Sequence, residues 1–141
     1  MSIALEICRG LIFLQYADIL HHDLKCENIL ITDSLEPKIY NFELARYTSG
    51  HTTSLNDLMT KNVAPWLAPE KLAYFKARYT TQCEIFSFGM LLWELAFEKI
   101  PYQGWGVEKI KDHVIKGGRE KLYLEVQLQL LKFLNFKKSI K

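Results

Sequence analysis

Apolar side chains at helical spacing open the chain. Ile3, Ile7, Leu11 and Leu14 recur three or four residues apart, which places them on one face of a helix. The spacing therefore predicts a helix over residues 3–16. Gly10 lies inside this segment and weakens the helix without ending it.

Two short apolar runs further along predict a small β-hairpin. Ile29-Leu30-Ile31 is followed by turn-forming residues at 33–37 and then by Lys38-Ile39-Tyr40. β-branched residues on both sides of a turn favour two antiparallel strands. Residues 41–61 are rich in Ser, Thr, Asn, Gly and His and show little periodicity, so we expect a long loop there.

The second half of the chain predicts further helices. Thr81-Gln82-Cys83-Glu84 fits a capping box, in which the threonine oxygen accepts a hydrogen bond from a first-turn amide and the glutamate reaches back. Residues 85–97 are apolar nearly all round, so we expect a central helix that is buried on most sides. Shorter helices are predicted over residues 68–75 and 107–115, the second stopped by Gly117-Gly118.

Length, charge and cysteine content limit the class of protein. The chain has 141 residues, of which 49% are hydrophobic and 24% charged, typical of one globular domain. A formal net charge of +2 does not favour nucleic acid or an anionic membrane as partner. The longest apolar stretch is far shorter than the ~20 residues of a membrane span, and Glu6 and Arg9 interrupt the apolar start, so no secretory signal is predicted. Three scattered cysteines, Cys8, Cys26 and Cys83, make no disulfide framework and indicate a reducing, cytoplasmic location.

One loop concentrates the side chains that phosphoryl transfer requires: His21-His22-Asp23-Leu24-Lys25-Cys26-Glu27-Asn28. In that reaction a carboxylate orients the attacking hydroxyl and takes its proton, an ammonium group balances the charge on the phosphate, and an amide oxygen helps to hold a magnesium ion. His21, His22 and Cys26 could instead be metal ligands, but their spacing fits no recognised zinc pattern.

This loop resembles the catalytic loop of protein kinases, H-R-D-L-K-x-x-N, at every fixed position except His22. Further matches follow in the family's order: Asn41-Phe42-Glu43 for D-F-G, Ala68-Pro69-Glu70 for A-P-E, Glu84 to Gly89 for the start of the buried central helix, where the family usually has Asp first, and Ile100-Pro101-Tyr102 for the loop after it. Because order and spacing agree over residues 3–118, the chain is identified as a member of the protein kinase family, with the features of its Ser/Thr and tyrosine-kinase-like branch.

The resemblance implies a mainly α fold, namely the C-lobe of a protein kinase, with a small β-hairpin that carries the active-site loops. It divides the chain into a partial kinase-like domain over residues 1–118 and a divergent tail over residues 119–141. Both helical and strand spacing fit the tail, and helix is the preferred interpretation. No glycine-rich phosphate loop or nucleotide-binding strand lysine precedes Ile3, so we expect the N-lobe to be missing.

The resemblance also implies roles for particular residues. Asp23 would be the catalytic base, and Lys25 would contact the phosphates and balance their charge. Asn28 and Asn41 would be the magnesium ligands and, together with Lys25 and Leu30, would bind ATP, with Leu30 as the floor of the adenine pocket. The alternatives are that the polar residues only hold the loop by hydrogen bonds and that Leu30 is ordinary strand core.

Several positions depart from the family pattern. Asn41 replaces the D-F-G aspartate and offers magnesium a dipole in place of a full charge, while Glu43 replaces a glycine and costs the loop some freedom. His22 replaces an arginine and is only partly charged near neutral pH. Glu70 lacks the downstream arginine with which the family pairs it, because Arg119 is the last arginine in the chain. We expect Glu70 either to turn to solvent or to leave the lobe less stable.

The function implied by the resemblance is ATP-dependent phosphoryl transfer to protein hydroxyls, with ATP and Mg²⁺ as cofactors and a protein substrate or signalling partner. Since residue 41 is neutral and half of the nucleotide cleft is missing, we expect this chain alone to be inactive or nearly so. Two alternatives are a pseudokinase that acts as a binding or scaffold module and a truncated product without a stable fold.

Overall fold

The protein is mainly helical, with small two-stranded sheets. The computed structural model describes residues 3–49 and 63–122. Its α-helices in that part of the chain are α1 (Ile3–Tyr16), α2 (Pro69–Ala73), α3 (Thr81–Phe97) and α4 (Val107–Ile115). Short 3₁₀ turns form η1 (Cys26–Asn28), η2 (Phe42–Leu44) and η4 (Ala64–Trp66). The strands β1 (Ile19–Leu20), β2 (Ile29–Ile31), β3 (Pro37–Ile39) and β4 (Arg46–Tyr47) pair antiparallel as β1–β4 and β2–β3.

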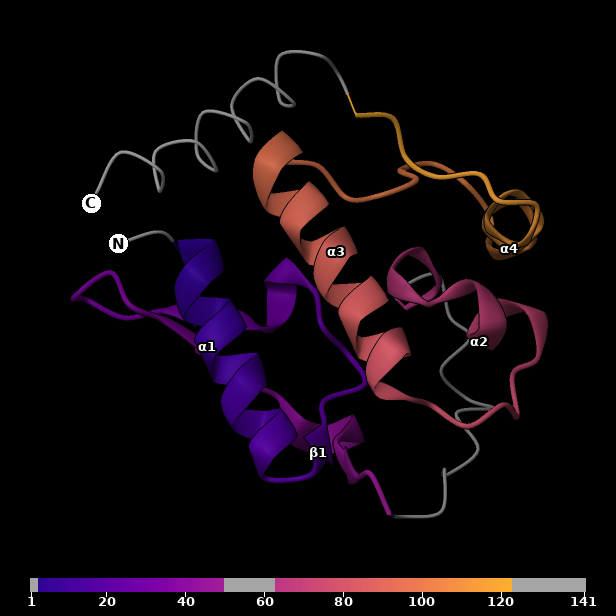
Figure 1. Ribbon diagram of the computed structural model, residues 1–141. Helices are drawn as coiled ribbons and strands as arrows, with labels where there is room; N and C mark the ends of the chain where they lie inside the picture. Colours follow the sequence, from indigo (N-terminus) through magenta and orange to yellow (C-terminus); the bar gives the residue numbers. More distant parts are fainter. Residues whose placement is uncertain (1–2, 50–62, 123–141) are drawn as a thin grey trace, which may run out of the picture.

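Helix α3 lies between α1 on one side and α2 with α4 on the other (Figure 1). Towards α1, Leu91 packs with Ile7 and with Leu24 of the loop that follows β1. Towards α2, Met90 belongs to a core cluster that contains Leu72. Burial of these apolar side chains removes them from water and fixes α3 as the element that joins the two halves of the molecule.

The expectation that α3 is covered on most sides is confirmed, because within residues 85–97 only Ile85, Gly89 and Ala96 are exposed. Its buried residues recur three or four positions apart and therefore form a single stripe: Cys83, Glu84, Ser87, Met90 and Leu91. Ile85, on the opposite stripe, is 63% exposed.

The predicted capping box at the start of α3 is wrong. The N-cap is Thr80, whose hydroxyl oxygen accepts a hydrogen bond from the Cys83 amide at 3.4 Å. Glu84 does not reach back to the cap, because its carboxylate accepts hydrogen bonds from the backbone amides of a distant loop. A tertiary contact has replaced the local one that the sequence pattern favoured.

The predicted first helix and hairpin are confirmed. Helix α1 covers residues 3–16, and β2 pairs with β3 in a register that places Ile29 opposite Ile39. A Cβ at Gly10 would lie 3.1 Å from Ile39 Cδ1, so the missing side chain allows β3 to approach α1. Of the predicted loop at 41–61, the described residues 41–49 contain η2 and β4, and the remainder lies outside the described residues.

The two shorter helices are confirmed as well. Helix α2 begins at Pro69, a residue that suits the first helical position because its missing N–H needs no partner there. Helix α4 covers the predicted residues 107–115, and Gly117 follows it with a φ of 87°. The predicted tail helix lies beyond the described residues. Of the helices in the described ranges, none has the length and apolar content to span a membrane.

Candidate active site

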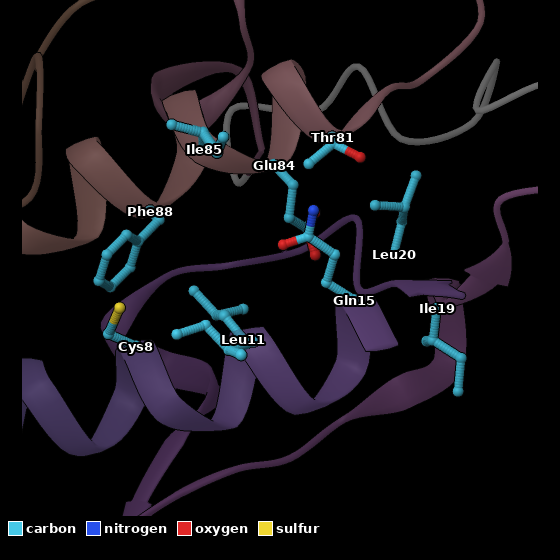
Figure 2. Close-up of a pocket in the computed structure, with 10 residues that line it drawn as sticks. Cys8, Leu11, Gln15, Ile19, Leu20, Thr81, Glu84, Ile85 and Phe88 are labelled. Atoms are coloured by element: carbon cyan, nitrogen blue, oxygen red, sulfur yellow. The ribbon is translucent and has the colours of Figure 1, made fainter. Parts of the chain in front are cut away.

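The carboxylate of Glu84 anchors the loop at residues 21–28 to α3. Its two oxygens accept the backbone amides of His21, at 2.5 Å, and His22, at 3.2 Å, and Oε2 also accepts the hydroxyl of Tyr79 at 2.8 Å. Glu84 is buried, so these bonds compensate for the water that its charge has lost. Figure 2 shows the residue at the start of α3, between α1 and β1.

A second carboxylate of the same helix holds the far end of the loop. Glu94 Oε2 accepts the amide of Cys26 at 2.9 Å and the indole N–H of Trp66 at 3.1 Å. Burial, reinforced by this carboxylate, raises the pKa of the Cys26 thiol to about 12. The thiol therefore stays protonated at neutral pH, which removes it as a nucleophile or a thiolate ligand.

Asp23, Lys25 and Asn28 are brought together between these two anchors. The Asn28 side-chain nitrogen donates to both the backbone oxygen and Oδ2 of Asp23, each at 2.7 Å. Lys25 Nζ lies 3.4 Å from the same Oδ2 and 3.3 Å from a carboxylate oxygen of Glu27. All three residues are buried, so the loop presents one oriented carboxylate next to one cation.

Asn41 joins this group from the end of the hairpin. Its side-chain nitrogen donates to Asn28 Oδ1 at 3.1 Å. The residue has a φ of 64° and a ψ of 66°, a left-handed conformation that asparagine adopts more readily than most residues. Leu30 lies on β2, and its surface is 51% exposed.

His22 occupies the family's arginine position without carrying its charge. Its ring stacks on Tyr79, with centroids 3.9 Å apart. Burial, followed by the nearby cations Arg46 and Lys71, lowers the pKa of His22 to about 4. The imidazole is therefore neutral at pH 7 and offers no positive charge to a phosphate.

Glu70 turns to solvent, one of the two outcomes expected for it. The residue is exposed, and its Oε1 accepts the thiol of Cys83 at 3.2 Å. The neighbouring Lys71 is buried instead, and its ammonium donates to the carbonyl oxygens of Phe75 and Ala77. No uncompensated carboxylate is therefore left inside the fold at this motif.

The sequence did not reveal that Glu84 and Glu94 fix the catalytic loop. The available signal was two acidic residues inside an otherwise apolar helix, since a charge in such a place needs partners. A small pocket of about 120 Å³ between α1, β1 and α3 includes Glu84 in its wall (Figure 2). That pocket has a mainly apolar wall, and the residues that line it do not include Asp23, Lys25, Asn28 or Asn41.

Comparison with known proteins identifies the class to which this site belongs. The chain matches the family model described as protein tyrosine and serine/threonine kinase over residues 1–136. The chain belongs to the protein kinase family. This match continues past the predicted boundary at residue 118 into the predicted tail.

Individual relatives include both kinds of kinase. Tyrosine-protein kinase csk-1 of Caenorhabditis elegans is 33% identical over 120 residues, which are 84% of this chain and 22% of that protein. A fibroblast growth factor receptor of Strongylocentrotus purpuratus is 38% identical over 122 residues, 84% of this chain and 12% of the receptor. The probable serine/threonine-protein kinase drkC of Dictyostelium discoideum is 33% identical over 123 residues, 86% of this chain and 16% of that protein. The chain thus spans less than a quarter of these relatives.

Protein kinases use ATP with Mg²⁺, and the donor atoms of the site determine whether this ion can bind here. Mg²⁺ prefers carboxylate oxygens in a near-octahedral shell. Asn28 Oδ1 already accepts from Asn41, and Asp23 Oδ2 is engaged by Asn28 and Lys25. Within residues 3–49 and 63–122, no group of three His, Cys, Asp or Glu side chains is placed to hold a metal ion. In this arrangement the residues do not fit a magnesium site.

Proposed function

We propose that this chain is the C-lobe of a protein kinase domain in which the catalytic loop is retained and phosphoryl transfer is lost or very slow. In this proposal the lobe acts as a pseudokinase module that binds a signalling protein. The observation that carries it is the presence of an amide, Asn41, beside an otherwise intact loop, bonded to Asn28. The neutral His22 supports the same conclusion, since it cannot pair with a phosphorylated loop.

The retained residues have the chemistry of the family's reaction. Asp23 would accept the proton of a protein hydroxyl, and its orientation by Asn28 supports that role. Lys25, 3.4 Å from Asp23, would balance the charge that develops on the phosphate. ATP, when bound, would supply the phosphoryl group, and the exposed Leu30 would contact its adenine.

The cellular setting proposed is the cytoplasm. Cys8, Cys26 and Cys83 are free thiols, as is usual in a reducing compartment. The near-neutral formal charge of +2 supports a protein partner over nucleic acid.

A phosphotransfer assay tests the proposal. The purified chain is incubated with radiolabelled ATP, Mg²⁺ and a generic protein substrate, beside Asp23→Ala and the control Asp33→Ala, which alters an exposed aspartate in the hairpin turn. We expect no incorporation above background in any of the three. Incorporation that is present in the parent chain and in Asp33→Ala but vanishes in Asp23→Ala would show an active enzyme and overturn the proposal.

Thermal melting separates the binding module from a truncated product without a stable fold. The buried anchors of the catalytic loop and the clusters around Leu91 and Met90 predict one cooperative transition. The absence of any cooperative transition in the full chain would favour the unstable product.

A further inference from the structure

The orientations of the two side-chain amides in the site follow from their partners. Asn28 directs its NH₂ group at two oxygens of Asp23, a carbonyl and a carboxylate, which only accept hydrogen bonds. Its other end, Oδ1, must therefore face Asn41. Asn41 must in turn present its NH₂ group, because two oxygens facing each other at 3.1 Å would repel. The chain of donors thus runs from Asn41 to Asn28 to Asp23.

We infer that the Asn41 amide hydrogen takes the place of a metal ion. In this chain a hydrogen bond joins Asn41 to Asn28 without a divalent cation. A carboxylate at residue 41 would convert the same position into a cation site. A carboxylate has no hydrogen to donate to Asn28 Oδ1, so a cation would have to lie between the two groups. The amide removes this requirement. The inference rests on the proposed function, since it explains how the loop stays ordered after the magnesium-binding carboxylate has been lost.

The backbone around Asn41 holds the amide in place. The Tyr40 amide donates to the Asn28 carbonyl oxygen at 3.1 Å, and the Tyr40 carbonyl accepts from His21 Nε2 at 2.9 Å. On the other side of Asn41, the ring of Phe42 meets the ring of His21 edge-on, with centroids 5.0 Å apart. Because both neighbours are fixed to the catalytic loop, the Asn41–Asn28 hydrogen bond forms with little loss of conformational freedom.

The local charges lead to the same conclusion. Asp23 carries a negative charge in direct contact with the Asn28 amide, and the ammonium of Lys25 lies 3.4 Å from its Oδ2. The carboxylate of Glu27 also lies 3.3 Å from that ammonium. A divalent cation at Asn28 would meet one shared carboxylate and two neutral amides, which is a weak donor set for Mg²⁺.

Thermal melting of the full chain with Mg²⁺ alone tests the inference without nucleotide or phosphotransfer. Three chains are compared in EDTA and in millimolar Mg²⁺: the parent, Asn41→Asp, and Gln103→Glu, which adds the same charge at an exposed position away from the site. We expect the parent and Gln103→Glu to melt at the same temperature in both buffers. Asn41→Asp should melt lower than the parent in EDTA and recover with increasing Mg²⁺.

Either of two melting results would overturn the inference: a saturable rise for the parent chain with Mg²⁺, or no Mg²⁺ response in a folded Asn41→Asp chain. If Asn41→Asp does not fold, paramagnetic Mn²⁺ is titrated into the isotopically labelled parent chain. Unbroadened Asn28 and Asn41 side-chain amide signals would support the inference, and selective broadening of that pair would refute it. Phosphotransfer by the parent would refute the proposed function through a different readout, so the two failures are distinguishable.

Discussion

Protonation of His22 is expected to contribute a defined part of the protein's loss of stability in acid. Its ring is buried against Tyr79 and lies near the cations Arg46 and Lys71, which together lower the pKa of the imidazole from 6.5 to about 4. The unfolded chain, whose histidine keeps the ordinary pKa, binds the proton more tightly than the folded chain does. The stability contributed by His22 is therefore fully present above pH 6.5 and is lost as the pH falls towards 4.

The difference between the two pKa values sets the magnitude of the effect. A shift from 6.5 to about 4 corresponds to about 3 kcal/mol in the free energy of unfolding once the pH is below both values. Between pH 7 and pH 5 the loss is about 2 kcal/mol by the same relation. Either value is a large fraction of the stability of an ordinary domain.

Urea unfolding, followed by tryptophan fluorescence at pH 7 and pH 5, measures this loss. The matched variant is His22→Phe, which keeps an aromatic ring against Tyr79 and cannot bind a proton. Contributions from other titrating groups cancel when the two pH-dependent losses are subtracted. We expect the parent chain to lose about 2 kcal/mol more than the variant. Equal losses in the two proteins would refute the argument that His22 is held neutral.

Further substitutions test the anchors and the packing. Glu84→Gln should lower the free energy of unfolding by roughly 2–4 kcal/mol in a urea titration, because an NH₂ group would then face backbone donors. Cys26, with a pKa of about 12, should resist iodoacetamide at pH 8 by mass spectrometry, and rapid alkylation in the folded chain would contradict the assigned environment. Gly118→Ala should lower the free energy of unfolding by about 1–3 kcal/mol, since its Cβ would lie 2.4 Å from the ring of His113. Gly89→Ala, where a Cβ meets no atom within 4 Å, should instead stabilise helix α3 by about 0.5–1 kcal/mol.

The elements that the sequence predicted correctly are those with local causes. Helices α1 and α4 follow from apolar residues at helical spacing, and the β2–β3 hairpin follows from a turn between two β-branched runs. The catalytic loop was equally accessible, because Asp23, Lys25 and Asn28 lie within a few residues of one another in the sequence.

The contacts that the sequence missed join residues far apart in the chain. Glu84 bonds to the His21 amide across 63 positions, and Glu94 bonds to Cys26 across 68. Such contacts depend on how α3 packs against the loop, which no short pattern encodes. The incorrect prediction of the capping box has the same cause. The backbone of the distant loop donates hydrogen bonds to the carboxylate that the local motif assigned to the helix N-terminus.

The most direct test of the account is an NMR measurement on the side-chain amides of Asn28 and Asn41 in the metal-free, isotopically labelled chain. The account predicts that the Asn28 NH₂ protons exchange slowly with water and show a nuclear Overhauser contact with the NH₂ protons of Asn41. Gln103, which is exposed, supplies the reference for fast exchange. If the Asn28 protons exchange as fast as those of Gln103 and show no contact with Asn41, the catalytic loop and the hairpin end do not form one hydrogen-bonded site, and the account is contradicted.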